Sequence, residues 1–169
     1  MLKILPCLLL GLYAAAAHAE PAGSVPSRFV FEETATLAPG ESIGNSPVGA
    51  RFRVPITGGS FKGPGMAGKI LAGGDDWQLK RADGSLVIDA NYMIQTDDGV
   101  SIRVHNVGVI YQKPEGGEAY LWCAPTFEAP MGKYGWMNDA IFVSRLTVGT
   151  DPQHPSVKVT IYEIGVSPQ

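Results

Sequence analysis

The fold class can be read from the stretch SLVIDANYMIQTDDGVSIRVHNVGVIYQ, residues 85–112, in which apolar and polar side chains alternate on both sides of an Asp-Asp-Gly turn. Gly99 tolerates the positive φ that a tight hairpin requires. The two flanking runs, about residues 85–96 and 100–112, are therefore predicted to be long antiparallel strands. Almost no window from Arg28 onward shows a 3.6-residue apolar period, so the pattern is all-β.

Similar short runs occupy the rest of the chain. They predict further strands at about residues 28–37, 51–57, 67–72, 76–81, 119–128, 139–149 and 157–164. A second Asp-Gly turn, Asp83-Gly84, extends the hairpins from about 76 to 128 into a meander. So many strands in one small chain need closure or a second sheet, because exposed edges recruit other chains. We predict a single, closed or nearly closed barrel of about 8–10 strands with little helix, over residues 28–166.

The amino terminus predicts export. Residues 1–19, MLKILPCLLLGLYAAAAHA, hold one cation, an apolar run and the small-residue pattern Ala17-His18-Ala19. This arrangement is typical of a secretory signal peptide. The apolar run is shorter than the roughly 20 residues that a spanning helix needs, so no membrane span is predicted. Residues 20–27 form a Pro/Gly/Ser-rich flexible leader, and the protein is expected to be periplasmic or secreted after cleavage near Ala19.

Composition excludes some partners and cofactors. Removal of Lys3 with the signal lowers the 13 basic residues to 12, against 16 acidic ones, so no nucleic acid is expected as a partner. Only Cys123 remains after cleavage, which excludes an intrachain disulfide and favours a buried inert thiol over a nucleophile. His105 alone cannot build a His-rich metal site. No cofactor and no metal are therefore predicted.

The Gly-rich segment at residues 55–65, PITGGSFKGPG, raises the question of a phosphate loop. It lacks the G-x-x-x-x-G-K-[ST] order and has no following helix whose N-terminus would meet an anion. A bulged or sharply turned strand connection is the favoured interpretation.

The order of motifs also carries a family resemblance. The run from RVPITGGSF through GGDDWQLK to SIRVHNVG, then FEAPMGKYGWMNDAIFV and the terminal IYEI, resembles a bacterial family known as domain of unknown function 3237. The similarity covers about residues 28–164. It implies a compact antiparallel barrel of calycin-like appearance, usually without a metal or organic cofactor, and it implies no settled activity.

Two carboxylates are candidate catalytic groups. In GGDDWQ, residues 73–78, Asp75 is expected to close the turn, whereas Asp76 and Trp77 begin a strand at which a carboxylate can face a barrel mouth beside an indole. Burial against an aromatic wall raises a carboxyl pKa and suits a general acid or base. Asp89 lies in mid-strand and needs a partner. A hairpin centred on Asp97-Asp98 pairs Asp89 with about residue 106, which allows a diagonal contact to His105 or Arg103, and a structural ion pair is favoured over catalysis.

Other polar and aromatic residues within the shared motifs are candidate ligand contacts: Trp77, Tyr92, Asn106, Glu128, Tyr134, Trp136 and Asn138. Asn106 shares a predicted strand face with apolar residues, so its amide must find partners or bind a ligand. We expect an exported barrel that binds a small, partly aromatic compound, with isomerase or lyase chemistry as one option. The alternatives are a non-catalytic lipocalin-like carrier or sensor, and a structural or interaction module of the cell envelope.

Overall fold

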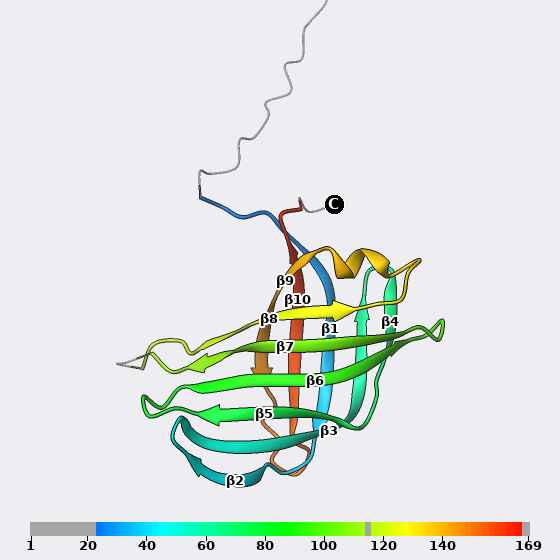
Figure 1. Ribbon diagram of the computed structural model, residues 1–169. Helices are drawn as coiled ribbons and strands as arrows, with labels where there is room; N and C mark the ends of the chain where they lie inside the picture. The colour runs from blue at the N-terminus through cyan, green and yellow to red at the C-terminus, as the bar shows by residue number, and fades with distance from the viewer. Residues whose placement is uncertain (1–22, 114–115, 167–169) are drawn as a thin grey trace, which may run out of the picture.

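The computed structural model describes residues 23–113 and 116–166 as an antiparallel β structure (Figure 1). The predicted signal peptide and the first residues of the leader lie outside the described residues. The elements are β1 (Ser27–Leu37), β2 (Glu41–Ser46), β3 (Gly49–Gly63), β4 (Met66–Ile70), β5 (Gly74–Lys80), β6 (Leu86–Thr96), β7 (Ser101–Tyr111), β8 (Tyr120–Glu128), the 3₁₀ helix η2 (Gly135–Asn138), β9 (Ile141–Val148) and β10 (Ser156–Ile164). None of the helices in the described ranges is long and apolar enough to cross a membrane.

The sheet closes on itself because β1 pairs with β10 on one side and with β3 on the other. The ring runs β1-β10-β9-β8-β7-β6-β4-β3, and β5 also bridges β3 and β6 while β2 pairs with β3. A closed ring removes the exposed edges that would recruit other chains. The predicted all-β antiparallel barrel is confirmed.

Two details of the strand prediction are wrong. No strand was predicted at β2, whose sequence ESIGNS is exposed throughout and carries no apolar alternation. The Gly-rich segment is the second half of β3 and not a connection, and the chain turns only at Pro64 and Gly65. The bulge expected there is present, as a register shift where Thr36 and Leu37 of β1 pair with Gly58 and Ile56.

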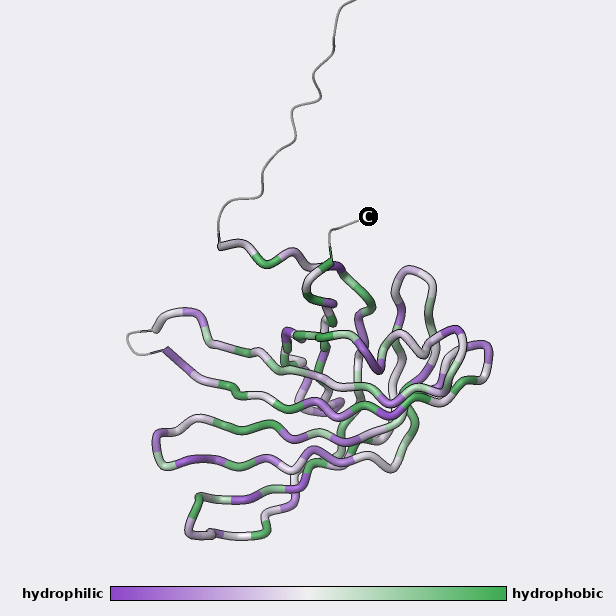
Figure 2. Tube along the Cα trace, turned by 45° about the horizontal axis from the view of Figure 1, so that its top comes forward, coloured by the Kyte–Doolittle hydropathy of each residue, from purple (hydrophilic) through white to green (hydrophobic). Residues whose placement is uncertain are grey.

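The hairpin of β6 and β7 has the register expected from its turn to within one residue: Asp89 pairs with Val107 and Asn91 with His105. Inward and outward residues alternate along both strands, which Figure 2 shows as a change of hydropathy from one residue to the next. Ile88, Ala90, Tyr92 and Ile94 are buried inside. This is the pattern of a barrel wall with one wet face.

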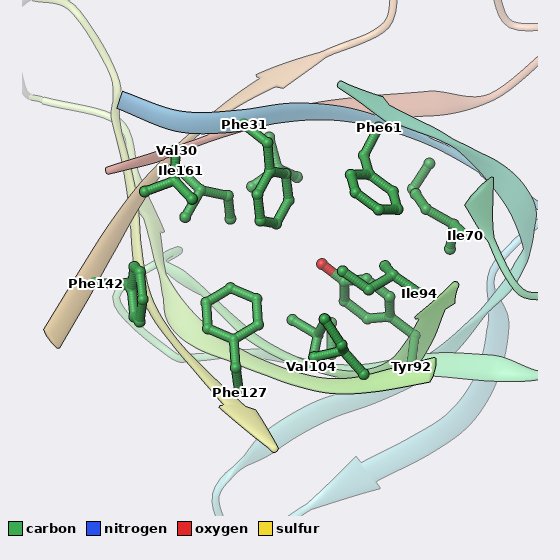
Figure 3. Close-up of a cluster of buried hydrophobic side chains, with 14 of the residues drawn as sticks. Val30, Phe31, Phe61, Ile70, Tyr92, Ile94, Val104, Phe127, Phe142 and Ile161 are labelled. Atoms are coloured by element: carbon green, nitrogen blue, oxygen red, sulfur yellow. The ribbon is translucent and has the colours of Figure 1, made fainter. Parts of the chain in front are cut away.

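The core is a ring of apolar side chains that surrounds the barrel axis (Figure 3). Four phenylalanines from different strands are in ring contact: Phe31 with Phe61, Phe31 with Phe127, and Phe127 with Phe142, at centroid distances of 5.2, 6.0 and 4.8 Å. The Tyr92 hydroxyl points toward the middle of this ring. The barrel therefore places polar groups in an apolar interior, where they need partners.

Candidate functional site

The barrel interior holds a set of buried polar side chains contributed by different strands. They are Glu33 on β1, Asp76 on β5, Tyr92 on β6, Asn106 on β7 and Ser144 on β9, all with less than a tenth of their surface exposed. A buried polar group is costly unless it is bonded, so each partner decides whether the group serves the fold or is available to a ligand.

Glu33 and Tyr92 form a pair across the barrel. Glu33 is 1% exposed, and its Oε1 accepts a hydrogen bond from the Tyr92 hydroxyl. Burial raises the pKa of Glu33 from 4.5 to about 7, although the Tyr92 bond acts in the opposite sense. The second oxygen, Oε2, is buried and has no hydrogen-bond partner among the described residues. At neutral pH Glu33 therefore exists in both protonation states, with one oxygen available.

Tyr92 keeps its proton. Burial and the neighbouring Glu33 charge raise its pKa well above 10, so the hydroxyl acts as a donor at neutral pH. The pair thus combines a carboxyl group that can gain or lose a proton with a phenol that remains protonated.

Asp76 is also inward and buried, but both of its oxygens are bonded. Oδ1 accepts from the Asp89 backbone N–H at 3.0 Å and Oδ2 accepts from Gln78 Nε2 at 2.7 Å. Burial raises the pKa of Asp76, and the two bonds lower it. The Asp76 carboxylate therefore satisfies a backbone N–H group of β6, that of Asp89.

The position of that bond explains the motif GGDDWQ. The β5–β6 register pairs Asp76 with Ala90 and resumes at Leu79 with Val87. The Asp89 N–H that meets the Asp76 carboxylate lies between these two pairs, where the Asp76 side chain replaces a backbone acceptor. Gly74 permits the close approach of β5 to β6, because a Cβ at this position would lie 2.4 Å from Tyr92 Cβ. The motif therefore holds β5 and β6 together where their backbone pairing is interrupted.

Three further polar side chains, Asn106, Cys123 and Ser144, lie on β7, β8 and β9, the strands that follow β6 around the barrel. The Ser144 hydroxyl donates to Asn106 Oδ1 at 3.2 Å, so Asn106 finds the partner that its place on an apolar face demands. Cys123 is free and buried, as expected, and burial raises its pKa to about 12. A thiol with such a pKa stays protonated and is a poor nucleophile.

The outer surface carries three of the predicted site residues. Asp89 faces outward and lies 2.8 Å from His105 Nε2, which is the structural pairing that the hairpin register favoured. Glu128 is exposed and pairs with Arg103. Trp77 is 40% exposed, and the expectation that its indole faces the same cavity as Asp76 is wrong, because consecutive strand residues point to opposite faces.

The remaining three predicted residues lie in the segment between β8 and β9. Tyr134 is buried and donates to Asp98 Oδ1 at 3.0 Å. Asn138 ties the segment together: its Nδ2 donates to the carbonyls of Ala129 and Gly135 at 3.0 and 2.9 Å. Trp136 is 37% exposed and lines a pocket of about 690 Å³ at the end of the barrel.

The structure brings Tyr92, Asn106 and Asp76 into the interior but also places Glu33 there, a residue that the sequence interpretation missed. The signal was present in the alternation of β1, where Glu33 falls in phase with Phe31 and Ala35, both core residues. A carboxylate on an apolar strand face is the informative exception. Within the described ranges, no group of three or more His, Cys, Asp or Glu side chains is placed to hold a metal ion.

The fold and this interior define a class of protein: a closed antiparallel barrel with a buried carboxyl–phenol pair. The chain belongs to the family described as "Protein of unknown function (DUF3237)", which matches residues 26–164. The match agrees with the resemblance seen in its motifs.

Individual relatives are consistent with this assignment. A UPF0311 protein of Clostridium acetobutylicum is 37% identical over 127 residues, which cover 68% of this chain and 80% of the relative. A β-barrel-like protein of Acinetobacter baumannii has a crystal structure that superposes with a TM-score of 0.76 at 27% identity, covering 87% of this chain and 99% of that one. The hydroalkoxylation enzyme phnH of Penicillium herquei is 31% identical over 111 residues, covering 66% of this chain and 67% of the enzyme.

Proposed function

We propose that the protein is an exported, cofactor-independent acid–base enzyme. It adds an O–H group across a C=C bond of a small, partly aromatic compound, or catalyses the reverse elimination. The observation that carries the proposal is the Glu33 carboxyl, which is 1% exposed, has a pKa of about 7 and has no partner for Oε2 in the part of the chain that the structure describes. A pKa near the working pH is optimal for a group that both takes and returns a proton.

The chemistry needs two proton transfers and no change of oxidation state. Glu33 as carboxylate removes the proton of the attacking hydroxyl group while the oxygen of that hydroxyl group bonds to one alkene carbon. Glu33, now a carboxylic acid, gives this proton to the other alkene carbon, and Tyr92 keeps its own proton and donates a hydrogen bond to Glu33 throughout. The proton thus moves from oxygen to carbon, and both side chains return to their starting states.

Two further observations support this reaction class. A relative that shares 31% identity over 111 residues is named a hydroalkoxylation enzyme, and hydroalkoxylation is the addition of an O–H group across a C=C bond. The apolar ring around the Tyr92 hydroxyl also excludes water, which strengthens electrostatic interactions with developing charge (Figure 3). Export rests on the amino-terminal pattern of residues 1–19 and belongs to the proposal.

The test compares Glu33→Gln and Tyr92→Phe with the wild type on a panel of alkenyl phenols, with cyclised products quantified by liquid chromatography and mass spectrometry. Glu33→Gln should lower kcat/KM by about 100-fold or more, the usual contribution of a general base. Glu32→Gln is the matched control, because Glu32 is the neighbour on β1, points outward and pairs with Lys158 at 3.1 Å. The wild-type rate should rise through about pH 7 as Glu33 ionises.

A different result would redirect the assignment. Full activity in Glu33→Gln would exclude Glu33 as the base. Tight binding of these compounds by the wild type without turnover of any of them would favour the lipocalin-like carrier over the enzyme.

A further inference from the structure

The pocket of about 690 Å³ lies where three parts of the chain meet at one end of the barrel: the start of β1, the β3–β4 hairpin and the segment leading into η2 (Figure 1). Its apolar lining includes the buried residues Val30, Met66 and Tyr134. Phe29 and Trp136, which are 40% and 37% exposed, also line it and present aromatic surface to solvent. Partly exposed aromatic surface at a pocket is suited to an aromatic ligand.

Both cations at this pocket already have partners. Arg28 Nε donates to Glu163 Oε2 at 3.1 Å, and Glu163 is 8% exposed. Lys133 Nζ lies 2.9 Å from Asp98 Oδ2. A charged ligand would have to compete with one of these pairs or lose hydration without gaining a counter-ion, which is costly. The pocket is therefore matched to a ligand without net charge.

The wall of the pocket is arranged in advance. The Arg28 guanidinium lies 5.5 Å from the centroid of the Trp136 ring and restrains the indole. Tyr134 is held by Asp98, and Asn138 bonds two carbonyls within the same segment. When the binding surface is ordered before the ligand arrives, less conformational entropy is lost on binding and the affinity is higher.

A row of aromatic rings connects this pocket with the Glu33–Tyr92 pair. Trp136 contacts Phe142 at 5.8 Å, and Phe142 continues through Phe127 to Phe31. Phe31 contacts Phe61, which pairs directly with Glu33 across β1 and β3. Apart from Trp136, the rings of this row are buried in the core, so the pocket is linked to the proposed acid–base pair through packed side chains.

We infer that this pocket binds an uncharged aromatic ring. That the bound ring belongs to the substrate rests on the proposed function, whereas the binding itself is measurable without turnover. The preferred ligand class is a neutral phenol or aryl alcohol, and aryl carboxylates and arylamines are discriminated against.

Calorimetric titration with three ligands of matched shape tests the inference: 2-naphthylmethanol, 2-naphthoate and 2-naphthylmethylammonium. The neutral alcohol should bind at least about tenfold more tightly than either ion, since each ion lacks a free counter-charge. Trp136→Ala should weaken binding of the alcohol about tenfold. Tyr120→Ala is the control, because Tyr120 is a similarly exposed aromatic residue, 45% exposed, at the start of β8 and outside the pocket lining.

A further variant, Glu163→Gln, tests why the pocket is expected to discriminate against a negatively charged ligand. Glu163→Gln retains a carbonyl oxygen for Arg28 but removes the negative charge, so the affinity for 2-naphthoate should rise at least about tenfold while that for the alcohol stays within about twofold. Equal affinity of the wild type for the alcohol and the carboxylate would overturn the inference, as would unchanged affinity in Trp136→Ala.

The two proposals fail in different ways. If Trp136→Ala weakens binding but no compound is turned over, the pocket assignment holds and the enzyme assignment fails. If turnover depends on Glu33 while Trp136→Ala leaves both the Kd of the probe and the KM of the substrate unchanged, the enzyme assignment holds and the pocket assignment fails.

Discussion

Glu33 and Asp76 are both inward-facing carboxylates, at 1% and 8% exposure, and burial raises the pKa of each. They differ in their partners. Each oxygen of Asp76 accepts a hydrogen bond, one from the Asp89 backbone N–H and one from the Gln78 side-chain amide. Glu33 has a bond from Tyr92 on one oxygen and none on the other among the described residues.

This difference separates a structural carboxylate from one that is available for chemistry. Removing the acceptor of a bonded backbone N–H leaves that group unsatisfied, so Asp76 is tied to the integrity of the β5–β6 wall. A carboxyl group with a free oxygen already bears its desolvation cost, and a substrate hydroxyl that bonds to it relieves part of that cost. Stability should therefore depend most on Asp76 and catalysis most on Glu33.

The first prediction concerns Asp76→Ala. The change leaves the Asp89 N–H and the Gln78 amide without their acceptor, and it should lower the free energy of unfolding by about 3 kcal/mol, measured by urea denaturation. The residual folded protein should keep kcat within a few-fold of the wild type.

Asp76→Asn is the matched variant, because its carbonyl oxygen can still accept from Asp89 while the Gln78 amide can turn its own oxygen toward the new NH₂. It should recover most of the lost stability. An Asp76→Asn protein of wild-type stability whose kcat falls 100-fold would transfer the proton-moving role from Glu33 to Asp76.

The second prediction concerns the pH dependence of stability. The pKa of Glu33 is raised on folding from 4.5 to about 7, so the folded protein binds more protons than the unfolded chain in this window. The stabilisation from this group is complete below about pH 4.5 and is lost as pH rises through about 7, with a total of about 3 kcal/mol. Glu33→Gln should remove this part of the slope, as followed by thermal or urea unfolding at pH 5, 6, 7 and 8.

The comparison with Asp76 sharpens this measurement. The pKa of Asp76 is also raised, so the contribution of Asp76 to the pH dependence has the same sign as that of Glu33 and is retained in Glu33→Gln. Glu32→Gln should retain the full wild-type slope, since Glu32 faces outward beside Lys158. A wild-type protein whose stability does not change between pH 5 and 8 would contradict the assignment of Glu33 as a buried group that titrates near neutrality.

The sequence predicted the barrel because strand alternation and Asp-Gly turns are local signals, and the β6–β7 hairpin shows how far they reach: its turn predicted the pairing of Asp89 to within one residue. The Glu33–Tyr92 contact joins residues 59 positions apart across the barrel, so no local pattern contains it. Trp77 was misplaced because adjacency in sequence was taken for adjacency in space, whereas a strand separates neighbours onto opposite faces. The signal that could have identified Glu33 was the two-residue alternation of β1, which places Glu33 on the same face of the strand as Phe31 and Ala35.

The third prediction uses Asp89, a carboxylate on the wet face of the same barrel wall. Its side chain is 45% exposed and pairs with His105, which is 36% exposed, at 2.8 Å. An exposed side-chain pairing contributes little to stability because water competes for both partners, so Asp89→Ala should change the free energy of unfolding by less than about 1 kcal/mol, measured by urea denaturation. Measured beside Asp76→Ala, this variant applies the same truncation to an exposed and to a buried carboxylate, and it retains the Asp89 backbone N–H that donates to Asp76. If this variant lost as much free energy of unfolding as Asp76→Ala, the Asp89 side chain, and not the Asp76 carboxylate, would be the group that holds β5 and β6 together.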